Sequence, residues 1–344
     1  MKIKWGVIGC GGIADRRTIP GMMLAENAEL VAVMDTNFEL AKAVKEKYGA
    51  QQAFDNIDDL LSLNEIQAVY IATPVFCHKE QVEKAAKKGK HILLEKPLGI
   101  DIQESKQIVQ ICKDANVKLG VGFMMRFHSC HKMMKEVVSS GGIGEIVSAS
   151  AKFTCWYPEM ANAWRQKKSL SGGGAMMDMA IHCVDLIRYI TNLEVTEVVA
   201  MNSNTIFNYE VEDSGCLIMR LKNGALCSVE ANFNIPDDAA VCRLEICGSG
   251  GSMSAGGTIG QEDTGSVQIR RCSAENYDAS QQRKDALAEV FNGKNGNMYK
   301  DEIESFGNSI LNNTEYFLCG EDALLSQMVI EAAYKSGGNK SVTI

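Results

Sequence analysis

The chain has 344 residues with a formal net charge of −8, and 46% of its residues are hydrophobic. A chain of this length is too long for one ordinary hydrophobic core, so we predict two folded domains. The negative net charge disfavours nucleic acid and anionic membranes as partners. No apolar run reaches the roughly 18 residues that span a bilayer, and no signal peptide follows Met1, which predicts a cytoplasmic protein.

The first part of the chain, residues 1–125, alternates short β-branched runs with amphipathic helical stretches, a rhythm typical of a parallel sheet wound with helices. The expected strands are 3–9, 30–35, 52–54, 69–73, 92–95 and 118–123, and the expected helices between them include 38–48, 79–88 and 102–116. This order of elements predicts an α/β domain with the doubly wound parallel sheet of the Rossmann fold.

The rhythm changes in residues 126–344. Helices are expected at 131–139, 175–191, 299–311 and 321–335, and strands at 146–156, 195–201, 215–221, 225–233 and 241–247. Turn signals such as Lys222-Asn223-Gly224 separate the later strands, which predicts an α+β domain with a large open, mostly antiparallel sheet. Residues 255–295 are Gly-rich and polar.

The first expected strand runs into a glycine-rich turn that fits the pattern G-x-G-x-x-G/A. The turn is Gly9-Cys10-Gly11-Gly12-Ile13-Ala14, between an apolar strand and the start of a helix. Gly9 permits the tight turn, Gly11 lets the backbone approach a pyrophosphate, and helix N-terminal N–H groups face the phosphates. We therefore predict that Gly9, Gly11, Gly12 and Ile13 bind a dinucleotide. A glycine turn without a ligand is the alternative.

Asp35 ends the second expected strand. A carboxylate at this point accepts hydrogen bonds from the adenosine ribose hydroxyls and repels a 2′-phosphate. The following Thr36-Asn37 supplies no arginine for such a phosphate. The sequence therefore favours NAD over NADP, although an Asp at a strand end is also a common helix N-cap.

Two more motifs follow expected strands at the carboxyl edge of the parallel sheet, where ligands bind in open α/β folds. They are Thr73-Pro74, with His78 shortly after, and Glu95-Lys96-Pro97. We assign Thr73, Pro74, His78, Glu95 and Lys96 to the cofactor site. The proline restricts Lys96 to extended geometry, and the bond between them could be cis. A solvated surface charge is the alternative for Lys96.

A polar stripe marks the helix expected at 175–191. Asp178, His182 and Asp185 share one of its faces, while the surrounding residues are apolar. Polar groups on a buried helix need a partner or a cavity, so these three are candidate site residues; a stripe facing solvent is the alternative. Trp164-Arg165 and Ser171-Gly172-Gly173-Gly174 precede this helix.

The chain contains 12 cysteines without a C-x-x-C pair, so we expect reduced, mostly buried thiols. The cluster His128, Cys130 and His131 lacks zinc-type spacing and has no partner pair elsewhere. We therefore predict no metal site.

In these motifs the chain resembles the glucose-fructose oxidoreductase/inositol dehydrogenase/MocA-like family. The resemblance rests on the turn at 9–14, on Glu95-Lys96-Pro97, and on Gly172-Gly173-Gly174 followed by Asp178 and His182. The stretch 320–342 is also similar, so the match covers nearly the whole chain. The motifs are specific for the family but carry no information about the substrate.

The resemblance implies a cleft between the two domains, a sugar or polyol substrate, and a homodimer or homotetramer built through the C-terminal sheet. It implies that Lys96 and His182 handle the proton and that Asp178 supports His182 or the substrate. Trp164 and Arg165 would lie near the cofactor.

The chain departs from the family pattern at three positions. Val75 stands where Asn is common, Met124 where a polar residue is frequent, and Ala180 where Gly is frequent. These departures affect the expected shape of the pocket more than its chemistry. Met124, His128, Tyr157 and Trp164 are further candidates for its lining.

The expected reaction is hydride transfer between the nicotinamide and a secondary hydroxyl of a sugar or cyclic polyol. His182 would take the hydroxyl proton, and the Lys96 ammonium would stabilise developing alkoxide character. Two other functions stay open at this point: an NAD-dependent glycosidase that oxidises its substrate transiently, and a non-catalytic dinucleotide-binding regulator.

Overall fold

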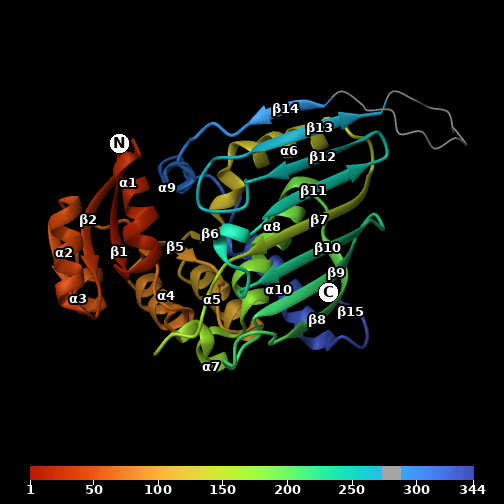
Figure 1. Cartoon of the computed structure of the whole chain (residues 1–344). Helices are drawn as coiled ribbons and strands as arrows, with labels where there is room; N and C mark the ends of the chain where they lie inside the picture. Colours follow the sequence, from red (N-terminus) through yellow and green to blue (C-terminus); the bar gives the residue numbers. More distant parts are fainter. Residues whose placement is uncertain (273–287) are drawn as a thin grey trace, which may run out of the picture.

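A computed structural model of the chain describes residues 1–272 and 288–344. Two sheets dominate the fold, a six-stranded sheet near the N-terminus and a nine-stranded sheet formed by later described strands (Figure 1). The expectation of an α/β protein with a Rossmann domain and a second domain around a large sheet is confirmed.

The six-stranded sheet is parallel throughout, with the strand order β3-β2-β1-β4-β5-β6. Its central strands are buried along nearly their whole length because helices cover both faces. The elements of this region are β1 (Ile3–Ile8), η1 (Ala14–Thr18), α1 (Ile19–Leu24), β2 (Ala28–Met34), α2 (Phe38–Tyr48), β3 (Gln52–Phe54), α3 (Ile57–Leu61), β4 (Ala68–Ile71), η2 (Val75–Cys77), α4 (His78–Lys87), β5 (His91–Glu95), α5 (Ile102–Asp114) and β6 (Leu119–Gly122).

The nine-stranded sheet has the order β14-β13-β12-β11-β7-β10-β9-β8-β15. Its pairs are antiparallel except for β7 with β10, which confirms the expectation of a mostly antiparallel sheet. The elements here are η3 (Met124–Phe127), α6 (Ser129–Ser139), β7 (Ile146–Thr154), η4 (Trp164–Gln166), α7 (Lys168–Ser171), η5 (Met176–Ala180), α8 (Ile181–Thr191), β8 (Val195–Ser203), β9 (Ser214–Leu221), β10 (Leu226–Asn232), η6 (Asp237–Ala239), β11 (Arg243–Gly248), β12 (Gly251–Gly256), β13 (Ser266–Arg271), β14 (Glu289–Asn292), α9 (Met298–Leu311), α10 (Gly320–Ser336) and β15 (Val342–Thr343).

The Gly-rich segment 255–295 contains β13 and β14, which extend the sheet at one edge. The strand β13 alternates between buried apolar and exposed polar residues only over its first positions, and β14 is mostly exposed. In a segment this rich in glycine and polar residues, the sequence pattern indicated no strands. Residues 273–287 of this segment lie outside the described residues.

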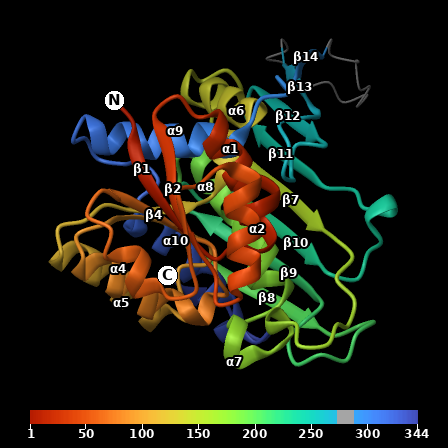
Figure 2. The same cartoon turned by 90° about the vertical axis from the view of Figure 1, so that its left-hand side faces the viewer.

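The two C-terminal helices connect the second domain to the first. In Figures 1 and 2 the blue helix α9 lies beside α1 of the Rossmann domain, and the two helices pack against each other. Helix α10 packs on both α5 and α8. The chain therefore returns to the first domain after completing the large sheet, which holds the two domains together.

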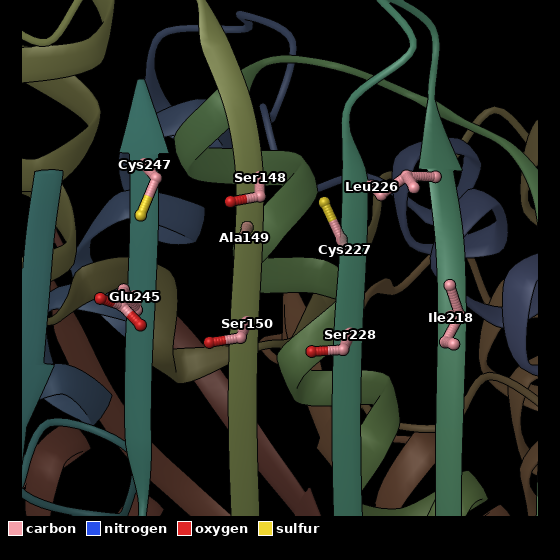
Figure 3. Close-up of a pocket in the computed structure, with 9 residues that line it drawn as sticks. All are labelled: Ser148, Ala149, Ser150, Ile218, Leu226, Cys227, Ser228, Glu245 and Cys247. Atoms are coloured by element: carbon pink, nitrogen blue, oxygen red, sulfur yellow. The ribbon is translucent and has the colours of Figure 1, made fainter. Parts of the chain in front are cut away.

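Helices α6, α8 and α10 lie against one face of the large sheet, and the opposite face, here named the outer face, carries no described helix (Figure 1). Strand β9 shows the alternation clearly, because Ile218 on the outer face is 52% exposed while Leu217 and Met219 are buried. Figure 3 shows part of the outer face, where serines of β7 and β10 lie between Glu245 and Ile218 in a shallow hollow of about 250 Å³.

Candidate active site

The glycine turn after β1 and the end of β2 form one hydrogen-bonded unit. Gly9 has φ +91°, and its neighbour Cys10 donates its backbone N–H to Asp35 Oδ2 at 2.9 Å. The other carboxylate oxygen of Asp35 accepts from Asn37 N, also at 2.9 Å. A Cβ on Gly11 would meet nothing within 4 Å. The backbone at Gly11 is therefore open to a ligand, as the dinucleotide pattern requires.

A pocket of about 400 Å³ lies over this turn, within the size range of small-molecule sites. It brings together every residue predicted for the cofactor except His78, Glu95 and Lys96, and it includes side chains from both domains. Its lining is Gly9, Gly11, Gly12, Ile13, Met34, Asp35, Thr36, Ala72, Thr73, Pro74, Phe76, Cys77, Gln81, Trp164 and Arg165.

Lys96 and Asp178 connect the two domains at the edge of this pocket. The peptide bond between Lys96 and Pro97 is cis. Lys96 Nζ donates to Asp178 Oδ1 at 2.7 Å and to the Asp178 carbonyl oxygen at 2.6 Å. The lysine side chain is only 13% exposed. Two residues from a strand end and a helix start, 82 positions apart, are thus in direct contact.

Asp178 also lies beside a second cation. Arg165 Nε stands 3.7 Å from Asp178 Oδ1, and the guanidinium stacks over the Trp164 ring at 4.3 Å. Burial would raise the pKa of Asp178, but the charges of Lys96 and Arg165 outweigh it and hold that pKa well below its usual range. The carboxylate is therefore ionised at neutral pH.

His182 is 5% exposed and lies between two aromatic rings, with Phe123 and Phe153 at centroid distances of 5.6 and 6.1 Å. Its Nδ1 is buried without a hydrogen-bond partner among the described residues. Burial and the charge of Lys96 lower the pKa of His182 well below its usual value, against the opposing charge of Asp178. The imidazole is therefore neutral, and a neutral imidazole has one ring nitrogen that can accept a hydrogen bond.

The triple glycine places the helix that carries both residues. A Cβ on Gly172 would lie 2.1 Å from Ile100 O, and one on Gly174 would lie 2.0 Å from Glu212 O. Glu212 Oε1 accepts from Gly174 N and Met176 N, each at 3.0 Å. The close approach of two backbones excludes larger residues here, and the Glu212 carboxylate fixes the start of η5.

The remaining predicted residues, His78 and Glu95, do not line the pocket but form hydrogen bonds next to it. His78 is buried, with Nδ1 3.1 Å from Pro97 O and Nε2 3.1 Å from Thr73 O, so it connects the two motifs at the strand ends. Glu95 Oε1 accepts a hydrogen bond from the Tyr70 hydroxyl at 2.5 Å.

Two residues that the sequence patterns suggested for the site lie in other clusters. Asp185 forms a buried ion pair with Arg126, so it does not join Asp178 and His182. The His128 ring packs against that of His131 at a tilt of 36°, and its Nδ1 lies 3.1 Å from Asp263 Oδ1, so His128 does not join the pocket lining for which it was a candidate. Among residues 1–272 and 288–344, no group of three or more His, Cys, Asp or Glu could hold a metal ion.

Several residues that support the site from a distance were not predicted from the sequence. Glu212 accepts hydrogen bonds from Gly174 of the triple glycine and from Tyr334, and Tyr70 donates to Glu95 at the strand end. None of these three supporting residues, Glu212, Tyr334 and Tyr70, lies in a motif. No local pattern marks such partners, because they come from other elements of the fold.

Comparison with known proteins assigns the family. Residues 3–123 match the family described as "Oxidoreductase family, NAD-binding Rossmann fold", and residues 131–254 match "GFO/IDH/MocA C-terminal domain". The chain belongs to the GFO/IDH/MocA oxidoreductase family. The resemblance inferred from the motifs is confirmed, and so is the expectation of an enzyme that uses NAD(P).

Relatives match over most of this GFO/IDH/MocA chain. The 1,5-anhydro-D-fructose reductase of Ensifer adhaerens is 27% identical over 324 residues, which cover 94% of this chain and 92% of the relative. Oxidoreductase P35 of Formosa agariphila is 32% identical over 259 residues, or 74% and 79% of the two chains. The structure of levoglucosan dehydrogenase in complex with NADH and levoglucosan superposes with a TM-score of 0.88 at 24% identity, over 100% of both chains.

Two further expectations concern partners and membranes. No helix in the described part of the chain is long and apolar enough to cross a membrane. The oligomeric state stays a prediction.

Proposed function

We propose that the protein transfers a hydride between a nicotinamide dinucleotide and a secondary hydroxyl or ketone of a sugar or cyclic polyol. One observation carries this proposal: Arg165 lines the dinucleotide pocket and also lies 3.7 Å from Asp178, which binds Lys96. The cofactor pocket and the Lys96–Asp178–His182 group are therefore parts of one site.

The residues present fit a dinucleotide. The open backbone at Gly11 and the N–H groups at the start of η1 suit a pyrophosphate, while Asp35 suits the ribose hydroxyls. When bound, the nicotinamide supplies the hydride acceptor or donor. The pocket residues Thr73, Pro74, Trp164 and Arg165 would hold it in place.

The protein's own task is to handle the proton of the reacting hydroxyl. His182 is neutral and takes this proton as the general base in oxidation, or returns it in reduction. Lys96, fixed by Asp178, donates a hydrogen bond to the same oxygen and stabilises its developing negative charge. Asp178 acts on Lys96 in this arrangement, since no described residue bonds Nδ1 of His182.

The substrate class rests on the relatives. Two of the three named relatives act on 1,5-anhydro-D-fructose and levoglucosan, as their names state, and both compounds are carbohydrates. Tyr157 adds a hydroxyl beside Arg165 and Asp178, where a sugar hydroxyl could be bound. We take a sugar, a sugar derivative or an inositol-like polyol as the substrate.

We further propose NAD rather than NADP as the preferred cofactor. Both oxygens of the Asp35 carboxylate are fixed by backbone N–H groups at the pocket wall. A fixed negative charge at this place repels a 2′-phosphate, and the lining beside it, Thr36, brings no cation.

Steady-state assays with NAD and with NADP against a panel of sugars and polyols test the proposal. We expect stoichiometric change of nicotinamide absorbance with at least one carbohydrate, and a higher kcat/KM for NAD. Release of an aglycone without net change of nicotinamide would instead indicate a glycosidase with transient oxidation. Cofactor binding without any turnover would indicate a non-catalytic regulator.

We also propose that the outer face of the large sheet joins copies of the chain into a homodimer or homotetramer. Ile218 and Leu226 are 52% and 50% exposed on this face, beside the small serines of β7 and β10 (Figure 3). Exposed apolar side chains gathered on a flat sheet are typical of an interface. Light scattering of the wild type and of Ile218→Lys tests this. We expect the wild type to be oligomeric and the variant to associate less, and a monomeric wild type would contradict the proposal.

A further inference from the structure

A second cleft lies between the domains, apart from the dinucleotide pocket. It measures about 320 Å³. One wall is the helix that follows the glycine turn, with Arg16, Arg17 and Pro20. The other wall consists of two loops of the C-terminal domain, residues 261–264 after β12 and residues 295–299 at the start of α9. A ligand in this cleft would contact both domains.

The C-terminal wall is held rigidly by Asp263. Its carboxylate accepts from Ser129 N at 2.9 Å, Ser129 Oγ at 2.5 Å and Gly296 N at 3.1 Å. Its carbonyl oxygen accepts from Asn295 N at 2.9 Å, which connects the two loops. The Asp263 carboxylate thus makes its hydrogen bonds within this wall of the cleft, and Asp263 is only 5% exposed. It contributes little negative charge to the cleft.

The two arginines differ in their partners. Arg17 bridges the domains, with Nε donating to Gln261 Oε1 and Nη2 to Glu262 Oε1, each at 3.2 Å. Arg16 is exposed and makes no ion pair or hydrogen bond with residues 1–272 or 288–344 in the structure. Glu262 pairs with Arg17, and the Asp263 carboxylate is hydrogen-bonded to Ser129 and Gly296. Arg16 is therefore a cation without an acidic partner among these residues. A guanidinium in this position favours phosphate or carboxylate oxygens, which it can bind in pairs.

The cleft also lies close to the site already described. Arg16 follows Ile13 of the dinucleotide pocket by three positions, at the start of the same helical segment. Thr18 Oγ1 of the same segment lies 2.9 Å from the Tyr70 hydroxyl, which donates to Glu95 Oε1 at 2.5 Å. Glu95 directly precedes Lys96. Two hydrogen bonds therefore connect the helix that forms one wall of the cleft to the strand end that carries the proposed proton-handling lysine.

The rest of the lining suits a carbohydrate. Gln261 and Asn295 bring amide groups, and Thr264 brings a hydroxyl. Such groups hydrogen-bond sugar hydroxyls without adding charge. The volume of the cleft exceeds what a lone anion would need and falls in the range of small-molecule sites.

We propose that this cleft binds an anionic substituent, a phosphate or a carboxylate, of the carbohydrate substrate, and that Arg16 is its main contact. The proposal rests on the proposed function, because it names the class of sugar that the same enzyme would take. It assigns to Arg16 a role in substrate choice and none in the proton transfer.

Calorimetric titration of the NAD-loaded protein tests the cleft without requiring turnover. The probes are glucose, glucose 6-phosphate, glucuronate and inorganic phosphate. The variants are Arg16→Gln and, as a matched control, Lys42→Gln, which removes an exposed charge from α2 of the same domain. Thermal unfolding of each variant confirms that it is folded.

We expect at least one of the two anionic sugars to bind at least about tenfold more tightly than glucose. A hydrogen bond to a charged group contributes enough free energy for a tenfold change in affinity. Arg16→Gln should abolish this preference, Lys42→Gln should keep it, and added salt should weaken it. Inorganic phosphate should compete with glucose 6-phosphate.

Three results would overturn the proposal: equal affinity for glucose and both anionic sugars, an equal loss in both variants, or binding of inorganic phosphate alone. A failure of the proposed function looks different. In that case no sugar is oxidised or reduced by the wild type, while the binding preference and its dependence on Arg16 are still measured.

Discussion

Lys96 and Asp178 meet across the domain boundary, where Nζ of the lysine lies 2.7 Å from Oδ1 of the aspartate. The lysine comes from the end of β5 in the parallel sheet, and the aspartate from η5 beneath the large sheet. Their contact exists only when the two domains are packed together. Arg165 Nε adds a second cation, 3.7 Å from the same carboxylate oxygen.

Replacing this aspartate should slow catalysis more than it weakens cofactor binding. Asp178→Asn keeps the shape of the side chain but removes the charge that fixes Lys96. We expect kcat to fall on the order of 10²-fold, the lower range for a positioned proton-transfer group. Steady-state kinetics measure this. Glu197→Gln is the control, because it removes a carboxylate from an exposed ion pair with Arg220. Unchanged kcat in Asp178→Asn would contradict the role given to Asp178.

Lys96→Met and His182→Ala should each lower turnover by roughly 10²–10⁴-fold, the range expected for a positioned acid or base. Neither side chain belongs to the lining of the 400 Å³ dinucleotide pocket. NAD affinity, followed by fluorescence titration, should therefore stay near that of the wild type. Full activity in either variant would remove that residue from the mechanism.

Cofactor preference should depend on the charge of Asp35. Asp35→Asn retains an oxygen that can accept from Cys10 N or Asn37 N but no longer repels a 2′-phosphate. We expect the ratio of kcat/KM for NADP to that for NAD to rise about tenfold, equal to about 1.4 kcal/mol. Asp15→Asn, which breaks an exposed pair with Lys47, serves as control. An unchanged ratio in Asp35→Asn would show that Asp35 does not discriminate between the cofactors.

The fold was predictable where sequence periodicity is strong. The parallel strands of the first domain are continuous apolar runs, and β7 to β11 were expected close to where they lie. Short elements escaped this reasoning: α3 has five residues, and β14 has an exposed, weakly alternating pattern. Such segments are stabilised by neighbours in the fold, and little in their own sequence marks them.

The site was predictable to the extent that its residues lie in motifs. Lys96 and Asp178 are in direct contact, and Arg165 lies beside Asp178 and in the pocket over the glycine turn, but Asp178 was expected to support His182 or the substrate rather than Lys96. Asp185 does not join this group, although it shares a helical face with His182 in the sequence pattern. Helical spacing shows which side chains point the same way, while the partner opposite each one depends on tertiary packing. Here the partner of Asp185 is Arg126, which comes from η3.

That ion pair should matter for stability. Arg126 Nε and Nη2 donate to the two oxygens of Asp185 at 2.8 and 2.6 Å, and both side chains are almost fully buried. In Asp185→Asn the Arg126 guanidinium keeps Asp322 as an acidic partner, so we expect the free energy of unfolding to fall by about 1–3 kcal/mol, the cost of leaving buried polar groups without a hydrogen-bond partner. Urea titration measures this. Glu230→Gln, in a surface pair with Lys152, should cost only about 0–1 kcal/mol. Equal effects of the two substitutions would refute a special role for the buried pair.

Stability should also fall in mild acid, because several histidines are buried in the neutral form. Burial lowers the pKa of His78 to about 4 and that of His131 to about 3. In the unfolded chain each would take a proton below about pH 6.5. Between these values the unfolded state binds more protons, so stability decreases as the pH falls, by up to about 1.4 kcal/mol per pH unit for each histidine.

Urea unfolding at several pH values between about 7 and 5 should therefore show a decreasing free energy of unfolding. His182 adds to the trend, because burial and Lys96 lower its pKa too. In His131→Gln the slope should be smaller, since one of the protons taken up on unfolding is gone. In the structure the His131 ring lies between Met125 O and Thr258 Oγ1, which isolates it from water. A free energy of unfolding that stays constant over this pH range would show that the folded chain also binds these protons, and that the histidines are less isolated than this packing indicates.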